Sequence, residues 1–297
     1  METEQYQHRP VLVEELLRLL EPAAGHVVLD GTVGLGGHAA ALLPRIMPGG
    51  RYIGLDLDEA MLAGARQRLA GEGLALYQAN FADFPEVLQR EQLAAVDHML
   101  LDLGVNSAQL ADAERGFSFE RDGPLDMRFD RRQTTRALDL VNRLSERELA
   151  DLFYRNAQEG NSRKIARRIC QARHAGRITT TLALARIVAS VQPRSGGGRG
   201  IHPATRVFQA LRVAVNDELG NLRRFLTRAL EFLRPGGKLA VISFHSLEDG
   251  IVKEFVRKAK AAGELDDLTP RPVVASPSER AANPRSRSAK LRVARRR

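Results

Sequence analysis

A glycine-rich stretch, HVVLDGTVGLGGH at residues 26–38, holds the residues best suited to bind a ligand. An apolar run ends on Asp30, glycines follow at positions 31, 34, 36 and 37, and His38 comes next. Glycine allows tight turns and a close approach of the backbone to a ligand, and N–H groups at a helix start can bind its polar groups. The stretch therefore predicts a nucleotide-like ligand between a strand and a helix.

Two cofactors fit this motif. Gly34-x-Gly36-x-x-Ala39 satisfies the dinucleotide fingerprint, and Asp56, after the next apolar run, could hold ribose hydroxyls of NAD or of S-adenosylmethionine. Asp30 favours S-adenosylmethionine, because a carboxylate attracts its cationic amino acid portion and repels a pyrophosphate. The later segment FLRPGGKLAVISF also resembles an element of class I methyltransferases. We therefore expect S-adenosylmethionine, with an NAD-dependent oxidoreductase as the alternative.

Strand and helix patterns alternate over the first hundred residues. Apolar runs at 26–30, 51–56, 74–79 and 96–103 predict buried parallel strands with helices between them. The alternation resumes late in the chain with a helix, a strand at 238–244 and a last strand candidate at 289–294. This repetition predicts a doubly wound, Rossmann-like α/β sheet of the class I methyltransferase type, built from residues 1–109 and 216–297.

Residues 110–215 contain helical patterns without a convincing buried strand, which predicts an inserted helical domain. Residues 161–212 carry eleven Lys or Arg and no acid, and the last eighteen residues carry eight more, again without an acid. The net charge of +9 is therefore segregated along the chain. Such segregation favours contact with the phosphates of a polyanion, and we expect the inserted domain to provide it.

Composition excludes several classes of protein. A chain of 297 residues with 43% apolar content can fill a core. The single cysteine, Cys170, excludes an internal disulfide and a cysteine-rich metal site; we expect it to pack, and we expect no metal. The start METEQYQHRP has no apolar targeting core, and no window reaches the roughly 18 apolar residues of a membrane span. We expect a cytoplasmic protein without membrane contact.

Longer motifs carry a more specific resemblance. They are HRPVLVEELL, LDGTVGLGGHA, GLDLD, LLDLGVNSAQLADAERGFSFERDGPLDMR, IHPATRVFQALRVAVNDEL and SFHSLED. Over nearly its whole length the chain resembles the bacterial small-subunit (16S) ribosomal RNA (cytosine-N4)-methyltransferase family. The resemblance implies N4-methylation of a cytidine in the decoding region, with S-adenosylmethionine as donor. It implies the ribosomal RNA or the assembling 30S subunit as partner, and it leaves open whether the chain forms a homodimer.

The resemblance also implies site residues. Those on the cofactor side are Gly36, Gly37, His38, Asp56, Phe81, Asp102 and Gln109. Ser243 and His245, at the end of another central strand, are the predicted catalytic pair on the substrate side, with a purely structural role as their alternative. Ser246 and Asp249 have the spacing of a helix capping box. The chain departs from the family pattern at Asn106, Ala108 and Gly250.

The implied chemistry depends mainly on alignment, because a sulfonium methyl is already activated while the lone pair of a cytosine amine is delocalised into the ring. Positioning can supply roughly 7–11 kcal/mol of a barrier, whereas a general base adds about 10²- to 10⁴-fold in rate. Asp102 and nearby carbonyls could accept the amine hydrogens, and the cytidine must leave its stack. A methyltransferase for another RNA and a non-catalytic RNA-binding assembly factor stay open as further alternatives.

Overall fold

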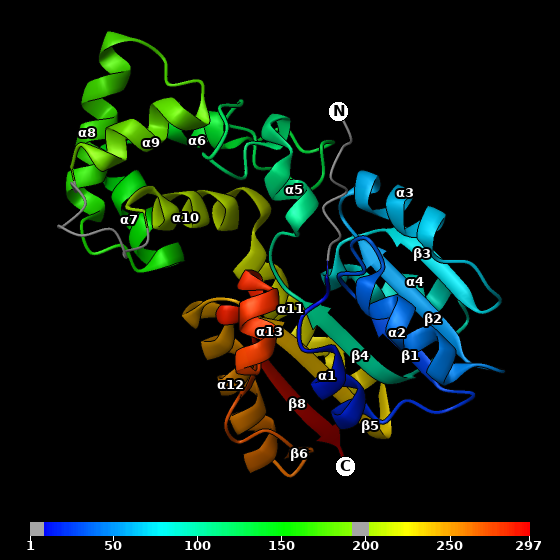
Figure 1. Ribbon diagram of the computed structural model, residues 1–297. Helices are drawn as coiled ribbons and strands as arrows, with labels where there is room; N and C mark the ends of the chain where they lie inside the picture. The colour runs from blue at the N-terminus through cyan, green and yellow to red at the C-terminus, as the bar shows by residue number, and fades with distance from the viewer. Residues whose placement is uncertain (1–8, 192–201) are drawn as a thin grey trace. The chain divides into compact units, whose positions relative to one another are not determined.

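The computed structural model describes residues 9–191 and 202–297 (Figure 1). The chain divides into two compact units. The α/β unit comprises Met1–Gly104 and Leu219–Arg297, and the helical unit comprises Val105–Glu218. In the described part of the chain, no helix is long and apolar enough to cross a membrane.

An eight-stranded sheet forms the centre of the α/β unit. Its strands are β1 (Val27–Asp30), β2 (Arg51–Asp56), β3 (Leu74–Gln78), β4 (Val96–Asp102), β5 (Leu233–Ser243), β6 (Leu265–Asp267), β7 (Val273–Val274) and β8 (Lys290–Arg296). The order is β3-β2-β1-β4-β5-β8-β6, with β7 paired to β8. Strands β3 to β5 in this order pair in parallel, and β8 runs antiparallel to β5. The expected Rossmann-like α/β fold is confirmed.

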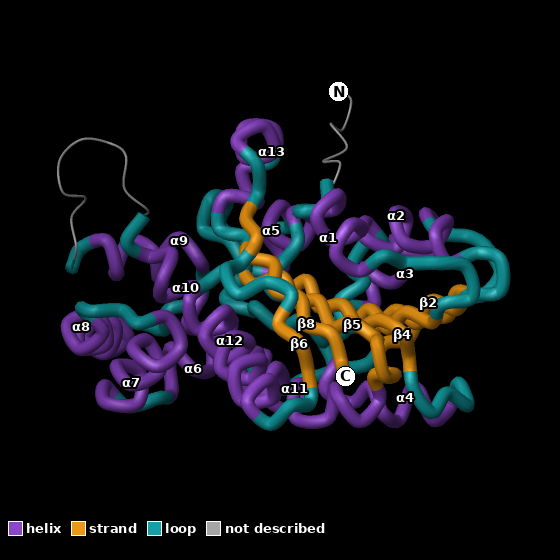
Figure 2. Tube along the Cα trace, turned by 90° about the horizontal axis from the view of Figure 1, so that it is seen from below, coloured by secondary structure: helices purple, strands orange, loops and turns teal. Residues whose placement is uncertain are grey.

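Both faces of this sheet are covered. The helices are α1 (Val13–Leu20), α2 (Gly37–Ile46), α3 (Glu59–Arg68), α4 (Phe84–Arg90), α11 (Glu218–Phe232), α12 (Ser246–Ala261) and α13 (Pro277–Ala282). Val27 and Leu29 of β1 pack in one core with α4, α11 and α12, whereas Val28 packs in a second core with α1, α2 and α3. Figure 2 shows these two helix layers on opposite sides of the strands. Burial on both faces explains why the strands appear in the sequence as continuous apolar runs.

The sheet has a topological switch point between β1 and β4. Strand β2, the next in sequence after β1, lies on one side of β1, and β4 lies on the other. Ligands of doubly wound sheets bind outside the carboxyl ends of the strands at such a point. The N–H of Gly31 donates a hydrogen bond to the carbonyl of Leu100 (2.9 Å), so the glycine-rich loop begins directly beside β4.

Helices build the second unit. They are α5 (Ser107–Ala111), α6 (Ala137–Arg143), α7 (Glu146–Ala157), α8 (Ser162–Ala175), α9 (Thr181–Ala189) and α10 (Ala204–Asn216). Within its described residues the unit contains no strand beyond an isolated bridge between Pro124 and Thr180. Its core includes Phe153 of α7 and Ile165 of α8, and Cys170 packs against it, as expected.

The basic carboxyl-terminal segment is used within the fold. Arg292 and Lys290 both pair with Asp249, at 2.6 Å and 3.2 Å. Arg295 and Arg297 both pair with Asp266, at 2.9 Å and 2.8 Å. Four cations of this segment therefore neutralise acids of the same unit. Strands β6 and β7, which the sequence did not predict, pair with β8.

Candidate active site

The loop between β1 and α2 presents backbone donors at its end. Gly34 and Gly36 have φ of 53° and 79°, a conformation that glycine adopts without strain. Gly36 precedes α2, and no side chain caps this helix start. The N–H groups of Gly37 and His38 form no hydrogen bond with a described residue. The start of α2 can therefore donate hydrogen bonds to a polar group of a ligand.

The first glycine of the loop allows close packing with two neighbours. A Cβ atom at Gly31 would lie 2.5 Å from Cδ2 of Leu101 and 2.7 Å from Cβ of Phe81. Phe81 begins the short 3-10 helix η1 (Phe81–Asp83) directly after β3, and its partly buried ring meets Phe225 edge to face. The structure thus brings Phe81 next to the glycine-rich loop, at the carboxyl ends of the strands, where its ring can contact a bound base.

Asp56, the last residue of β2, ties this loop to the following turn. Its Oδ2 accepts a hydrogen bond from Gly34 N–H and its Oδ1 accepts one from Asp58 N–H, each at 2.9 Å. Burial raises the pKa of Asp56 from 3.8 to about 7, although these two hydrogen bonds act in the opposite direction. Hydroxyl donors from a ligand would stabilise the ionised carboxylate, which suits a site for ribose.

Asp30 has a different role from the expected one. Its Oδ2 accepts a hydrogen bond from the Tyr52 hydroxyl (2.6 Å), and its Oδ1 accepts one from the N–H of Thr32 (3.0 Å). The residue is 1% exposed, and burial raises the pKa of its carboxyl. Asp30 therefore fixes the strand end and the loop from inside, and the structure does not present it as a direct ligand for the amino group of a cofactor.

The buried His38 and the partly buried Asp102 form a pair at the switch point. Nε2 of His38 lies 3.5 Å from Oδ2 of Asp102. Both ring nitrogens of His38 and Oδ1 of Asp102 are buried without a hydrogen bond to any described residue. Buried polar atoms are nearly always hydrogen-bonded, so this unused capacity indicates a ligand. Burial lowers the pKa of His38, but the carboxylates of Asp102 and Asp30 outweigh it and the pKa is raised.

Gln109 lies in the helical unit, in α5. Gln109 Oε1 accepts a hydrogen bond from Asn106 N–H (3.0 Å), and Asn106 Oδ1 accepts one from Gln109 N–H (2.9 Å). This reciprocal arrangement is a capping box, a role in which asparagine and serine are comparable. The family departure at Asn106 therefore keeps the helix cap, and a cofactor contact for Gln109 stays a prediction.

Ser243 and His245 both have structural contacts. Ser243 is 2% exposed, and its hydroxyl lies 3.5 Å from the carbonyl of Lys290 in the neighbouring strand β8. His245 precedes α12, where its Nδ1 accepts a hydrogen bond from Glu248 N–H (3.4 Å). The buried Nε2 of His245 has no hydrogen bond to a described residue, although Glu248 Oε1 lies 3.1 Å away. The burial of Ser243 and its contact with β8 favour a structural role for this residue. His245 keeps Nε2 without a hydrogen bond to a described residue.

The capping box of α12 lies one residue earlier than expected. The sequence suggested Ser246 with Asp249, but His245 and Glu248 form the reciprocal pair. Asp249 instead pairs with Lys290 and Arg292 of β8. Glu248 and Asp249 could each serve as the acid of a capping box. Because Lys290 and Arg292 of β8 bind Asp249, Glu248 is the acid that caps the helix.

Two site residues were missed from the sequence. The hydroxyl of Thr32 accepts a hydrogen bond from Asp102 N–H (2.6 Å), which fixes the end of β4 to the glycine-rich loop. Tyr52 reaches Asp30 from the neighbouring strand. Tyr52 could have been noticed in the sequence, because it lies in an apolar run that predicts a buried strand. A buried tyrosine hydroxyl needs a hydrogen-bond partner.

The assembled site is a group of polar atoms at the carboxyl ends of parallel strands. It combines free N–H groups at the start of α2, the Asp56 carboxylate and the unsatisfied atoms of His38 and Asp102. Among the residues that the structure describes, no group of three His, Cys, Asp or Glu is arranged to hold a metal. These groups can bind a ligand that carries hydroxyl, amino and carboxyl groups.

Comparison with known proteins gives a consistent result. Residues 5–297 match the sequence profile of the MraW methylase family. The chain is 50% identical over 288 residues to ribosomal RNA small subunit methyltransferase H of Deinococcus radiodurans, covering 97% of this chain and 89% of that protein. It is 47% identical to the protein of the same name from Syntrophotalea carbinolica, over the full length of both.

Solved structures are more distant in sequence. An rRNA methylase from Streptococcus thermophilus is 10% identical and covers 96% of this chain and 93% of that one, with a TM-score of 0.43. Fibrillarin from Aeropyrum pernix, in complex with S-adenosyl-L-methionine, is 13% identical and covers 94% of this chain and 74% of that one, with a TM-score of 0.39.

Proposed function

The chain belongs to the MraW methylase family, and from this membership we propose that it transfers a methyl group from S-adenosylmethionine to a cytidine N4 of small-subunit ribosomal RNA. Relatives covering nearly its whole length are named ribosomal RNA small subunit methyltransferase H. The match extends through both units, which supports assigning donor binding and substrate selection to this one chain.

The observation that best supports the site is the unused polar capacity at the switch point. His38 Nδ1 and Asp102 Oδ1 are buried and unsatisfied, and the N–H groups of Gly37 and His38 are free nearby in the chain. The donor is a nucleoside with an amino acid attached, so it can offer hydroxyl groups to Asp56 and polar groups to these atoms. The residues present therefore fit S-adenosylmethionine.

S-adenosylmethionine supplies an activated methyl group and leaves as a neutral thioether. The protein then has to align a weak amine nucleophile, and alignment can supply roughly 7–11 kcal/mol. Asp102, at the carboxyl end of β4, has an unsatisfied carboxylate oxygen that can accept a hydrogen bond from the cytosine amine. His38, paired to the other oxygen of Asp102, holds that carboxylate in place. Neither residue has to take a proton before the methyl group is transferred.

We assign RNA recognition to the helical unit. Its helix α8 carries Arg163, Lys164, Arg167 and Arg168, all exposed, and has no acid in its first turn. A separate hollow of about 440 Å³ is lined by Asn142, Arg143, Arg173, His174 and Arg177. Both features suit phosphate contacts of a ribosomal RNA or of an assembling small subunit. With such a substrate, we expect the enzyme to act in the cytoplasm.

Methyl transfer from labelled S-adenosylmethionine tests this function. Small-subunit RNA, protein-free or as a small subunit from cells lacking the enzyme, should gain label as N4-methylcytidine. Calorimetric titration with S-adenosylmethionine and with NADH separates the methyltransferase from the oxidoreductase alternative. RNA binding without any transfer would instead support the assembly factor.

A further inference from the structure

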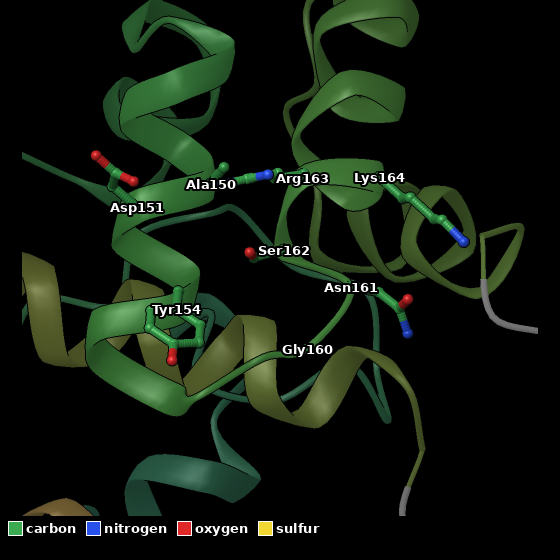
Figure 3. Close-up of a pocket in the computed structure, with 8 residues that line it drawn as sticks. All are labelled: Ala150, Asp151, Tyr154, Gly160, Asn161, Ser162, Arg163 and Lys164. Atoms are coloured by element: carbon green, nitrogen blue, oxygen red, sulfur yellow. The ribbon is translucent and has the colours of Figure 1, made fainter.

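A second hollow lies within the helical unit, between α7 and the start of α8 (Figure 3). Its volume is about 410 Å³. It is lined by Ala150, Asp151, Tyr154, Gly160, Asn161, Ser162, Arg163 and Lys164. Three features of this lining, an aromatic ring, a helix start and a hydroxyl without a partner, indicate what it binds.

Tyr154 provides an exposed aromatic wall. Its side chain is 63% exposed, and with Val274 it is one of two large apolar side chains exposed in the described part of the chain. Its neighbour Phe153 is fully buried in the helical core, so α7 does not need Tyr154 for packing. An exposed ring beside a hollow can stack on a nucleobase, whatever the base, because each base has a π face.

The first turn of α8 carries positive side chains, which are unfavourable at the start of a helix. Arg163 and Lys164 lie in its first turn, where the helix dipole favours negative charge, and no acid is present there. Glu159 Oε1 accepts the N–H of Asn161, the residue before the helix (2.8 Å), but no side chain accepts an N–H of the first turn, and neither Arg163 nor Lys164 forms an ion pair with a described residue. A bound anion would relieve this conflict, because it would meet the N–H groups of the first turn and the Arg163 side chain, which Figure 3 shows directed toward α7.

Ser162 adds a hydroxyl without a partner to the hollow. The residue is 7% exposed, and its hydroxyl forms no hydrogen bond with a residue that the structure describes. Figure 3 shows this hydroxyl pointing into the space between the two helices, on the side where Tyr154 and Arg163 lie. The hydroxyl of Ser162 can therefore donate a hydrogen bond to a ligand or accept one from it.

Together these features favour one ligand. We propose that the hollow binds an unpaired nucleotide of the substrate RNA, with its base stacked on the Tyr154 ring and its phosphate held by Arg163, Ser162 and the start of α8. Asp151, the acidic residue of the lining, lies on α7 and pairs with Arg155 at 3.8 Å, so the phosphate is favoured at the α8 side. The proposal rests on the proposed function and adds to it a stacking site outside the α/β unit for single-stranded RNA.

The test uses the full-length protein and a labelled oligouridylate, with fluorescence anisotropy as the measurement. Tyr154→Ala should weaken binding roughly 5- to 150-fold, the range for loss of one stacked base, while Tyr154→Phe should retain it. Arg163→Gln should lower the slope of log affinity against log salt by about 0.7, the value for one phosphate of a single strand. Ultraviolet cross-linking of the bound oligonucleotide should label the peptide that contains Tyr154.

Matched controls separate the possible causes of a loss. Lys258→Gln removes an equally exposed cation, paired to Glu254 on α12, and should leave the salt slope unchanged. Donor affinity of each variant reports on folding and should match the parent. A fully paired RNA duplex should bind equally to the parent and to Tyr154→Ala.

Three results would overturn the proposal. These are a parent that does not bind single-stranded RNA at low salt, a Tyr154→Ala variant with the parent's affinity, and a variant that loses affinity only for the assembled subunit. The last result would assign the hollow to a ribosomal protein. Failure of the proposed function is seen separately, as absence of methyl transfer by the parent protein.

Discussion

His38 Nε2 lies 3.5 Å from Asp102 Oδ2, and the two residues reach this position from opposite sides of the switch point of the sheet. His38 follows β1 through the glycine-rich loop, and Asp102 ends β4. The remaining polar atoms of the pair, Nδ1 of His38 and Oδ1 of Asp102, have no hydrogen bond to a described residue. The pair is thus held on one side by the protein and is available on the other to a ligand.

This pair predicts a pH-dependent contribution to stability. Because the pKa of His38 is raised above 6.5, the folded protein binds this proton more tightly than the unfolded chain does. The contribution is full below about pH 6.5 and is lost as the pH rises through the raised value. Urea unfolding of the parent and of His38→Gln should therefore give free energies whose difference shrinks above about pH 6.5. A difference that stays constant or grows with pH would contradict the assigned pairing.

Asp56 predicts a pH-dependent affinity for the donor. With a pKa of about 7, the carboxyl is mostly protonated at acid pH and accepts ribose hydroxyls only when it is ionised. Affinity for S-adenosylmethionine should be about tenfold weaker at pH 6 than at pH 8. Asp56→Asn should bind weakly at every pH, without this dependence. Calorimetric titration checks both, and an Asn variant that kept the parent's pH profile would place the titrating group elsewhere.

The Asp56 carboxyl should lower the free energy of unfolding as the pH rises, whereas a salt-bridged acid raises it. Its folded pKa lies above the unfolded value of 3.8, so its protonated form is favoured on folding. The free energy of unfolding of the ligand-free parent should therefore fall as the pH rises from about 4 to about 7, relative to Asp56→Asn. Bound donor should reduce this fall, because it stabilises the ionised form.

Gly36 predicts a coupled loss of stability and of donor binding. At φ of 79° a residue with a Cβ costs about 1–2 kcal/mol, and the Cβ would lie 2.6 Å from Cδ1 of Leu69, which would have to move. Gly36→Val should show this loss in urea unfolding and should abolish binding of S-adenosylmethionine. Gly250→Ala is the matched control, since nothing lies within 4 Å of its Cβ, and helix α12 should gain up to about 1 kcal/mol. Unchanged donor affinity in Gly36→Val would rule out the loop as the cofactor site.

Ser243 and His245 should separate in turnover measurements. The hydroxyl of Ser243 already faces Lys290, so Ser243→Ala should leave both donor affinity and kcat near the parent's values. The unsatisfied Nε2 of His245 is available to the substrate, so His245→Asn, which can keep the helix cap, should lower kcat and leave donor affinity unchanged. Single-turnover methyl transfer distinguishes the two. Equal effects of both substitutions would return His245 to a purely structural role.

Local chemistry explains why much of the site could be predicted from the sequence. Strands buried on both faces appear as apolar runs, and Asp30, Asp56 and Asp102 stand out because each ends such a run. Parallel strands bring these ends to one edge, so the sequence placed the carboxylates near a common crevice. Which of them faces a ligand was not predictable. Asp30 is satisfied by Tyr52, a partner determined by the pairing of β1 with β2.

Features that depend on distant partners could not be predicted. The His38–Asp102 pair and the bond from Asp102 to Thr32 require the register of β1 against β4, which periodicity does not specify. The cap of α12 moved to His245 because cations of β8 bind Asp249. Strands β6 and β7 are too short for a recognisable alternation.

The central claim is that this protein methylates a cytidine N4 of small-subunit ribosomal RNA through the pair at the switch point. The most direct measurement is mass spectrometry of nucleosides from small-subunit RNA of cells that lack the gene, complemented with the parent or with Asp102→Asn. N4-methylated cytidine should be lost on deletion, should return with the parent, and should stay absent or strongly reduced with Asp102→Asn at equal protein levels. Undiminished methylated cytidine in the deleted cells, or full restoration by Asp102→Asn, would contradict this claim.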